Sequence, residues 1–189
     1  SARETRLVGA SARASQAATF LLQQRVDDAD RAVMQALREF RALGDSTSYL
    51  YGNARITEGS IALMQGKLAD AEAHARAAQA SVSGTDSADR LARVVRGRAR
   101  MLLGSLLAQY AGRSEEGVRA LQSARATFDS LAGAGTTDEG SLLLLLSELP
   151  AATSPGVADS LGREAVAIFS RAAGPNSASV AQGLTLLAS

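Results

Sequence analysis

Apolar residues along most of the chain recur with the spacing of an α-helix, and no long stretch alternates with the period of a β-strand. Gly-rich or polar segments interrupt this pattern, and the principal interruptions lie at residues 44–46, 83–86, 133–137 and 174–177. The pattern therefore predicts an almost wholly helical, all-α chain with about nine helices and no sheet.

Shorter turns divide the longer segments into pairs of helices. Residues 65–67 and 111–114 each carry a Gly beside polar residues and are expected to join two antiparallel helices. We expect one domain over residues 1–189, built from hairpins at roughly 3–43, 46–83, 86–133 and 137–174 and a terminal helix at 177–188.

The second helix of each hairpin repeats one pattern, in which a small residue is followed at +4 by an apolar residue and at +7 by Ala. Taking the last Ala as a marker gives Ala36, Ala78, Ala124 and Ala172, which are 42, 46 and 48 residues apart. A two-helix unit of this length is typical of stacked arrays, in which each hairpin buries its apolar face against its neighbours. Ala78 and Ala124 are therefore predicted to lie buried between adjacent helices.

These small residues carry a resemblance to a known family. Residues Gly59, Gly66, Ala71 and Ala78 of the second hairpin, and Gly104, Gly112, Gly117 and Ala124 of the third, resemble the tetratricopeptide repeat. That motif has a small residue in its first helix, a Gly at the turn and Ala residues in its second helix. The resemblance implies a solenoid, a right-handed α-α superhelix of about four hairpins and a C-terminal helix.

The long repeat period indicates which subtype of the family the chain resembles. Residues 167–177, followed by 180–188, look like the kinesin-light-chain subtype of the repeat, which in bacteria often accompanies a Ser/Thr kinase or a signalling module. The chain departs from the family in lacking aromatic residues at most expected core positions and in carrying an insertion at residues 150–155. Its first hairpin also fits the motif weakly.

Composition narrows the classes of partner. The chain is 46% hydrophobic but 4% aromatic, without Trp, so its core is expected to consist of Ala, Leu, Val and Ile. The net charge of +1 gives no general attraction to nucleic acid or to an anionic membrane. The absence of Cys excludes disulfides and thiolate metal sites and leaves the compartment open.

The apolar run at residues 142–146 is too short to span a bilayer, so no membrane insertion is expected. Because the chain begins Ser1-Ala2-Arg3 without Met, we expect it to be a fragment of a larger protein, either cytoplasmic or extracytoplasmic.

The sequence contains few residues that could form a catalytic or cofactor-binding site. His74 is the only histidine and is expected on the surface of a helix, so an enzyme is not predicted. No metal-binding motif occurs; Asp27, Asp28 and Asp30 are expected near a helix N-terminus, as is the pair Glu115-Glu116 after Ser114. Residues 133–135 lack the Lys of a phosphate loop, and no cofactor is expected.

Arginines gather on the first helix of the third hairpin. Arg93, Arg96 and Arg100 share one stripe, and the opposite side carries Leu91, Val95, Leu102 and Leu106. One interpretation is a solvated face whose guanidinium groups pair with Asp86 and Asp89. The other makes the stripe part of a groove that receives an acidic peptide, since guanidinium groups bind carboxylates in a forked geometry.

The resemblance also implies a concave surface lined by the first helix of each hairpin. In the second hairpin the expected residues are Asn53, Ile56, Ser60 and Leu63, with core packing as the alternative for Ile56 and Leu63. In the third they are Arg98, Met101, Ser105 and Gln109. Family members that clamp a C-terminal carboxylate carry Lys and Asn where this chain has Ala14, Ala18 and Thr57, so a clamp for chaperone tails is not expected.

Two functions therefore remain open. The favoured one is a protein-interaction or scaffold module that binds a protein or peptide in its groove, and the resemblance points to a docking or sensing part of a bacterial signalling protein. The alternative is a regulatory domain that holds a small ligand in a pocket lined by Met64, Met101 and Tyr110. An open groove favours the first function and a closed apolar cavity favours the second.

Overall fold

The computed structural model describes residues 2–86, 88–109, 112–131, 136–149 and 154–188. These residues form nine α-helices and no strand, which confirms the predicted all-helical fold for this part of the chain. The helices are α1 (Ala2–Leu22), α2 (Val26–Ala42), α3 (Tyr49–Met64), α4 (Leu68–Ser81), α5 (Arg90–Gln109), α6 (Ser114–Asp129), α7 (Thr137–Ser147), α8 (Pro155–Ala173) and α9 (Ala178–Leu187).

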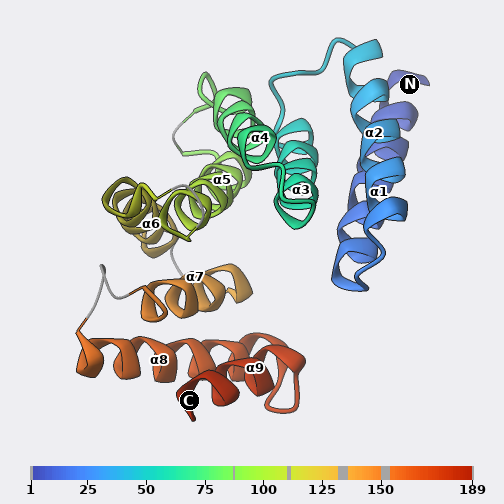
Figure 1. Ribbon diagram of the computed structural model, residues 1–189. Helices are drawn as coiled ribbons and strands as arrows, with labels where there is room; N and C mark the ends of the chain where they lie inside the picture. The colour runs from blue at the N-terminus through green and yellow to red at the C-terminus, as the bar shows by residue number, and fades with distance from the viewer. Residues whose placement is uncertain (1, 87, 110–111, 132–135, 150–153, 189) are drawn as a thin grey trace.

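The helices follow one another along an arc, with α1 and α2 at one end and α8 and α9 at the other (Figure 1). Each helix packs on its neighbour in sequence, and α1 also contacts α3, α3 contacts α5, and α5 contacts α7. The even-numbered helices α2, α4 and α6 make no comparable contact with one another among the described residues. The first helices of the hairpins therefore form a closer-packed row, and the arc curves around that row.

Left-handed backbone conformations end several of the helices. Gly66 and Gly112, at the hairpin turns, have φ of 72° and 65°, values that glycine adopts without the steric cost of a Cβ. The turn of the first hairpin has Gln24 instead, with φ of 59°. The sequence contains no Gly at this position, which explains why the first hairpin fits the repeat motif weakly.

Small residues allow the two helices of a hairpin to approach closely. A Cβ added to Gly97 of α5 would lie 2.7 Å from the Phe128 ring of α6, and one added to Gly140 of α7 would lie 2.7 Å from the Phe169 ring of α8. The aromatic ring therefore fills the space that the glycine leaves. Phe40 lies in the last turn of α2 and is also fully buried.

The predicted burial of Ala78 and Ala124 is confirmed, since both are fully buried, as is Ala36. The fourth marker is wrong, because Ala172 is exposed. Ala165 is fully buried in its place, four residues before Phe169, as Ala124 is before Phe128. Ala158, Ala165 and Ala172 of α8 recur every seven residues, and Phe169, four residues after Ala165, made the sequence pattern favour Ala172.

No helix among the described residues combines the length and the apolar character needed to cross a membrane. The expected insertion at residues 150–155 lies for the most part outside the described residues.

Candidate functional site

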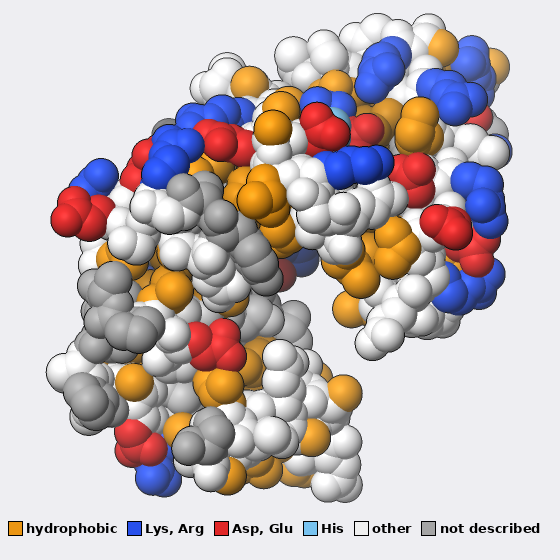
Figure 2. Space-filling view, in the orientation of Figure 1, with side chains coloured by type: hydrophobic (Ala, Val, Ile, Leu, Met, Phe, Trp, Pro, Cys, Tyr) orange, Lys and Arg blue, Asp and Glu red, His pale blue; other side chains and the backbone are white. Residues whose placement is uncertain are grey.

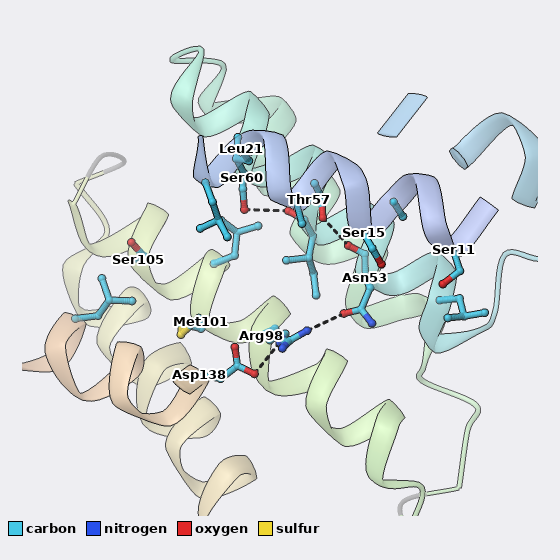
Figure 3. A pocket seen from close by; sticks show the side chains of 17 residues that line it. Ser11, Ser15, Leu21, Asn53, Thr57, Ser60, Arg98, Met101, Ser105 and Asp138 are labelled. Carbon is cyan, nitrogen blue, oxygen red and sulfur yellow. Dashed lines mark hydrogen bonds and ion pairs between the residues drawn. The ribbon is translucent and has the colours of Figure 1, made fainter. Parts of the chain in front are cut away.

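A groove of about 560 Å³ runs along the inner side of the arc. Figure 2 shows the molecule hollowed between the two ends of the arc, where hydrophobic and uncharged polar side chains predominate on the visible surface. The lining side chains come from α1, α3, α5 and α7, the closely packed row of first helices (Figure 3).

The groove is built from the same four positions in three successive first helices. In α1, α3 and α5 the lining residues are spaced i, i+3, i+4 and i+7, which places them on one helical face. The sets in α1 and α3 are offset by 42 residues, and those in α3 and α5 by 45. They are Ser11, Ala14, Ser15 and Ala18 in α1; Asn53, Ile56, Thr57 and Ser60 in α3; and Arg98, Met101, Leu102 and Ser105 in α5.

Six of the residues expected on the concave surface line this groove: Asn53, Ile56, Ser60, Arg98, Met101 and Ser105. Leu63 and Gln109 do not line it. Leu63 packs against two clusters of buried residues, one containing Ala75 and the other containing Leu106, so the alternative of core packing applies to it. Ile56 both lines the groove and packs against the core.

Ala14, Ala18 and Thr57, at the positions that the family uses to clamp a carboxylate, also line the groove. The sequence interpretation missed the serines of α1 and the contribution of α7. Ser11 and Ser15 come from α1, and Asp138 and Leu145 come from α7. The signal that could have found the α1 residues is the pair Ala10 and Ala17, which repeats the seven-residue spacing of Gly52 and Gly59 in α3. Aligning these pairs places Ser11 opposite Asn53.

Arg98 connects three of the four helices that line the groove. Its Nε donates to Asp138 Oδ2 of α7 at 2.8 Å, and its Nη1 donates to Asn53 Oδ1 of α3 at 3.4 Å (Figure 3). The carboxylate of Asp138 balances the guanidinium charge. The groove therefore presents an ion pair and no excess positive charge.

The hydroxyl groups of the groove fall into two kinds. Thr57 Oγ1 donates to the carbonyl of Asn53, and Ser60 Oγ donates to the carbonyl of Ile56, so both bond within α3. Ser11, Ser15 and Ser105 have no side-chain hydrogen bond to another described residue. Their hydroxyls can donate to and accept from a bound molecule without breaking a bond within the protein.

The arginine stripe does not line the groove. Arg96 Nη2 donates to the carbonyl of Val82 at 3.0 Å, and Arg93 Nη2 donates to the carbonyl of Ser130. Val82 and Ser130 are the C-caps of α4 and α6, so both guanidinium groups cap the negative ends of helices.

Arg100 of the same stripe donates from Nη1 to Thr127 Oγ1 of α6 at 2.8 Å. The predicted pairing of the stripe with Asp86 and Asp89 is wrong. Asp86 instead accepts from the backbone NH of Ala88, and Asp89 accepts from the backbone NH groups of Leu91 and Ala92 in the first turn of α5. Of the four residues expected opposite the stripe, Leu91 is exposed, whereas the other three are buried.

His74 is not the surface residue that the sequence suggested. Its side chain is 20% exposed, and Nδ1 lies 3.3 Å from Glu58 Oε2, the oxygen that also accepts from Arg55 at 2.6 Å. Burial lowers the pKa of His74, the negative charge of Glu58 opposes this shift, and the positive charge of Arg55 adds to it.

The acidic clusters lie at helix N-termini, as predicted. Asp27 and Asp28 are in the first turn of α2, and Glu115 and Glu116 are in the first turn of α6. Hydrogen bonding to Arg25 lowers the pKa of Asp28. Across the described part of the chain, no group of three or more His, Asp or Glu side chains could hold a metal ion.

The pocket suggested for a small ligand is not assembled as expected. Met101 lines the groove, but Met64 does not and is 53% exposed. Tyr110 and the Gly-rich residues 133–135 lie outside the described residues.

Comparison with models of protein families gives no match to this chain, and comparison with curated protein sequences gives none either.

Proposed function

We propose that the chain is a tetratricopeptide-like solenoid whose groove binds a partner protein or peptide. The observation that carries the proposal is the use of the same four positions in α1, α3 and α5 to build one continuous surface. A repeated unit that presents equivalent residues on its inner face is how solenoid proteins form extended binding surfaces.

The dimensions of the groove suit an extended segment of polypeptide. Four helices in a row are separated by three interaxial distances of about 9 Å, which gives a length of about 27 Å. At about 3.3 Å per residue, a fully extended peptide of roughly eight residues would cover the row.

The chemistry of the groove indicates which peptide would fit. Ile56, Met101 and Leu145 offer apolar contacts, while Ser11, Ser15 and Ser105 offer hydrogen bonds to a peptide backbone. Because Asp138 already neutralises Arg98, the groove does not select an acidic partner. We therefore propose a peptide that alternates apolar and small polar side chains. The resemblance alone supports a docking or sensing role in a bacterial signalling protein.

The second candidate function is the binding of a small ligand. The groove volume of about 560 Å³ falls within the range of roughly 300–1,000 Å³ that is usual for small-molecule sites. A ligand of this kind would contact Met101 and Arg98 near the middle of the row.

Selection of peptides from a random display library on the purified chain tests the proposal. Replacing Ser15 and Ser105 with Arg would place two bulky side chains in the groove and should weaken the selected peptides at least about tenfold, or about 1.4 kcal/mol. The matched control is Gln122→Arg on α6, an exposed residue outside the groove, which should leave affinity unchanged.

Equal affinity for the wild type and the double variant, measured by fluorescence anisotropy, would refute peptide binding in the groove. Two results together would favour the second function. The chain would select no peptide, and a small molecule would raise the melting temperature of the wild type but not that of the double variant.

A further inference from the structure

The arginine stripe faces a second, smaller hollow on a different part of the surface from the groove. The hollow has a volume of about 270 Å³ and lies between α5 and α6. Its polar lining consists of three guanidinium groups and three hydroxyl groups, from Arg93, Arg96, Arg100, Ser123, Thr127 and Ser130.

These three arginines lack the carboxylate partners that other arginines of this chain have. Arg98 pairs with Asp138, and Arg113 pairs with Glu72 and Glu116. No described Asp or Glu lies within 4.0 Å of the guanidinium nitrogens of the stripe. The C-termini of α4 and α6 supply about half a negative charge each. Three full positive charges therefore exceed the negative charge that the fold places beside them.

The guanidinium groups of Arg96 and Arg100 are close enough to repel one another. The pKa of Arg100 is lowered mainly by burial and further by the positive charge of Arg96. A bound anion would relieve both effects, since it would compensate the charge of a partly desolvated group.

The stripe is also held in place before any ligand arrives. One nitrogen each of Arg93, Arg96 and Arg100 donates to α6 or to the end of α4. A guanidinium carries five N–H donors, so each arginine retains donors for a ligand. Because these bonds already restrict the side chains, binding would cost little additional conformational entropy.

We propose that Arg93, Arg96 and Arg100 form an anion-binding site for a phosphate group, either inorganic phosphate or a phosphate monoester. A dianion with several equivalent oxygens can accept hydrogen bonds from three guanidinium groups at once, whereas a single carboxylate offers two oxygens and one charge. The hydroxyls of Thr127 and Ser130 lie at the same hollow, but each already donates its proton to a backbone carbonyl of α6. The guanidinium groups therefore supply the donors for the phosphate oxygens.

Titration of the ¹⁵N-labelled chain with inorganic phosphate, at constant ionic strength set with chloride, tests the proposal without altering the protein. The expected result is a saturable shift of the Nε–Hε signals of Arg93, Arg96 and Arg100. Shifts that chloride alone reproduces, or that fall on other arginines, would overturn it, because they would indicate general screening.

Variants give an independent measurement. Arg96→Gln with Arg100→Gln should weaken phosphate binding by at least about tenfold in isothermal titration calorimetry. Arg38→Gln with Arg41→Gln removes the same charge from exposed positions of α2 and should leave binding unchanged. Equal losses in the two double variants would contradict a specific site.

A single variant guards against loss of the fold. Arg100→Gln leaves the bonds of Arg93 and Arg96 to the helix ends intact, so its circular-dichroism spectrum should match that of the wild type. It should still weaken phosphate binding by about fivefold or more. A folded Arg100→Gln chain with unchanged affinity would refute the proposal.

Two further binding experiments identify the kind of molecule that carries the phosphate. Glycerol phosphate probes a soluble monoester, and phosphatidylcholine vesicles with and without phosphatidic acid probe a lipid headgroup. A lipid source would be assigned if the wild type and the α2 control cosediment with vesicles that contain phosphatidic acid and the Arg96→Gln, Arg100→Gln variant does not. Binding of glycerol phosphate alone would assign a soluble monoester. Specific binding of inorganic phosphate with binding of neither probe would assign inorganic phosphate as the ligand.

Discussion

At the scale of single residues, Gln24 occupies the turn position at which the other two hairpins have glycine, and this difference made the first hairpin hard to recognise from the sequence. The turns of the second and third hairpins have Gly66 and Gly112 in the left-handed region, and Gln24 adopts the same conformation at φ of 59°. The flanking sequence would have revealed the equivalence, because a basic residue precedes an acidic one by three positions after each turn. The pairs are Arg25 and Asp28, Lys67 and Asp70, and Arg113 and Glu116.

Gln24→Gly should therefore stabilise the chain. Relief of the left-handed strain gains about 1–2 kcal/mol and exceeds the entropy that glycine loses on folding, so we expect a net gain of about 0.5–1 kcal/mol in urea unfolding. The neighbouring Gln23→Gly, at a position without positive φ, should lower stability. Destabilisation by both substitutions would contradict the role assigned to Gln24.

The burial of His74 predicts a pH dependence of stability. Its pKa in the folded chain is lowered from 6.5, so the unfolded chain binds a proton more readily, and the free energy of unfolding should fall as pH drops through 6.5. The charged groups that act on it are Glu58, Arg55 and Asp70. Between pH 7.5 and 5.5 the wild type should lose more stability than His74→Gln.

Urea unfolding of both chains at the two pH values measures this difference. The pKa values of the Asp28 and Glu72 carboxylates are lowered, so these groups titrate below this range. Burial raises the pKa of Glu139, but this residue is present in both chains and its contribution cancels in the comparison. Equal losses in the wild type and the variant would show that His74 is not the titrating group.

At the scale of helices, the turns and the buried contacts were predicted best in the hairpins that have glycine at the turn and alanine at the contact. The hairpins of α3–α4 and α5–α6 carry Gly66 and Gly112 at their turns and Ala78 and Ala124 in their contacts, and both alanines are buried as expected. In α8 the pattern ends at Ala172, whereas the contact of Gly140 with Phe169 and the burial of Ala165 place the equivalent residue seven positions earlier. The equivalent residue in α8 is therefore determined by packing between helices, and the spacing of residues along α8 alone cannot identify it.

Packing at the corrected positions can be tested by enlarging the alanines. Ala78→Leu or Ala124→Leu should overpack a fully buried contact and cost about 1–3 kcal/mol. Ala172→Leu, at the exposed position that the sequence pattern had chosen, should change stability by less than about 0.5 kcal/mol. Melting temperatures compare the three variants, and a cost at Ala172 equal to that at Ala124 would refute the corrected register.

The arginine stripe belongs to the same scale. Its spacing along α5 was evident from the sequence, but its partners were not, because they lie on other helices at Val82, Thr127 and Ser130. The two interpretations of the sequence placed these side chains on a solvated face or in a groove for an acidic peptide, and neither assigned them contacts with other helices of the chain. Since Arg93 and Arg96 cap the ends of α6 and α4, reversal of their charge is now expected to destabilise the fold.

At the scale of the whole molecule, the groove follows from the way the hairpins stack. The resemblance to a repeat family anticipated most of the lining residues of α3 and α5, because both helices carry the matching glycines, although Leu63 and Gln109 do not line the groove. It could not supply Asp138, which reaches the groove only because α7 packs beside α5. The charge balance of the groove depends on this one residue, so it was not accessible from spacing.

Binding of a peptide in the groove is tested most directly by the methyl signals of methionine. The sequence has three methionines, of which Met101 lines the groove while Met34 and Met64 are exposed and do not. With ¹³C-methyl methionine and a peptide selected on the chain, we predict that the Met101 signal shifts in proportion to occupancy while the other two stay unchanged. An unshifted Met101 at saturation, with a shift at Met34 or Met64, would contradict binding in the groove.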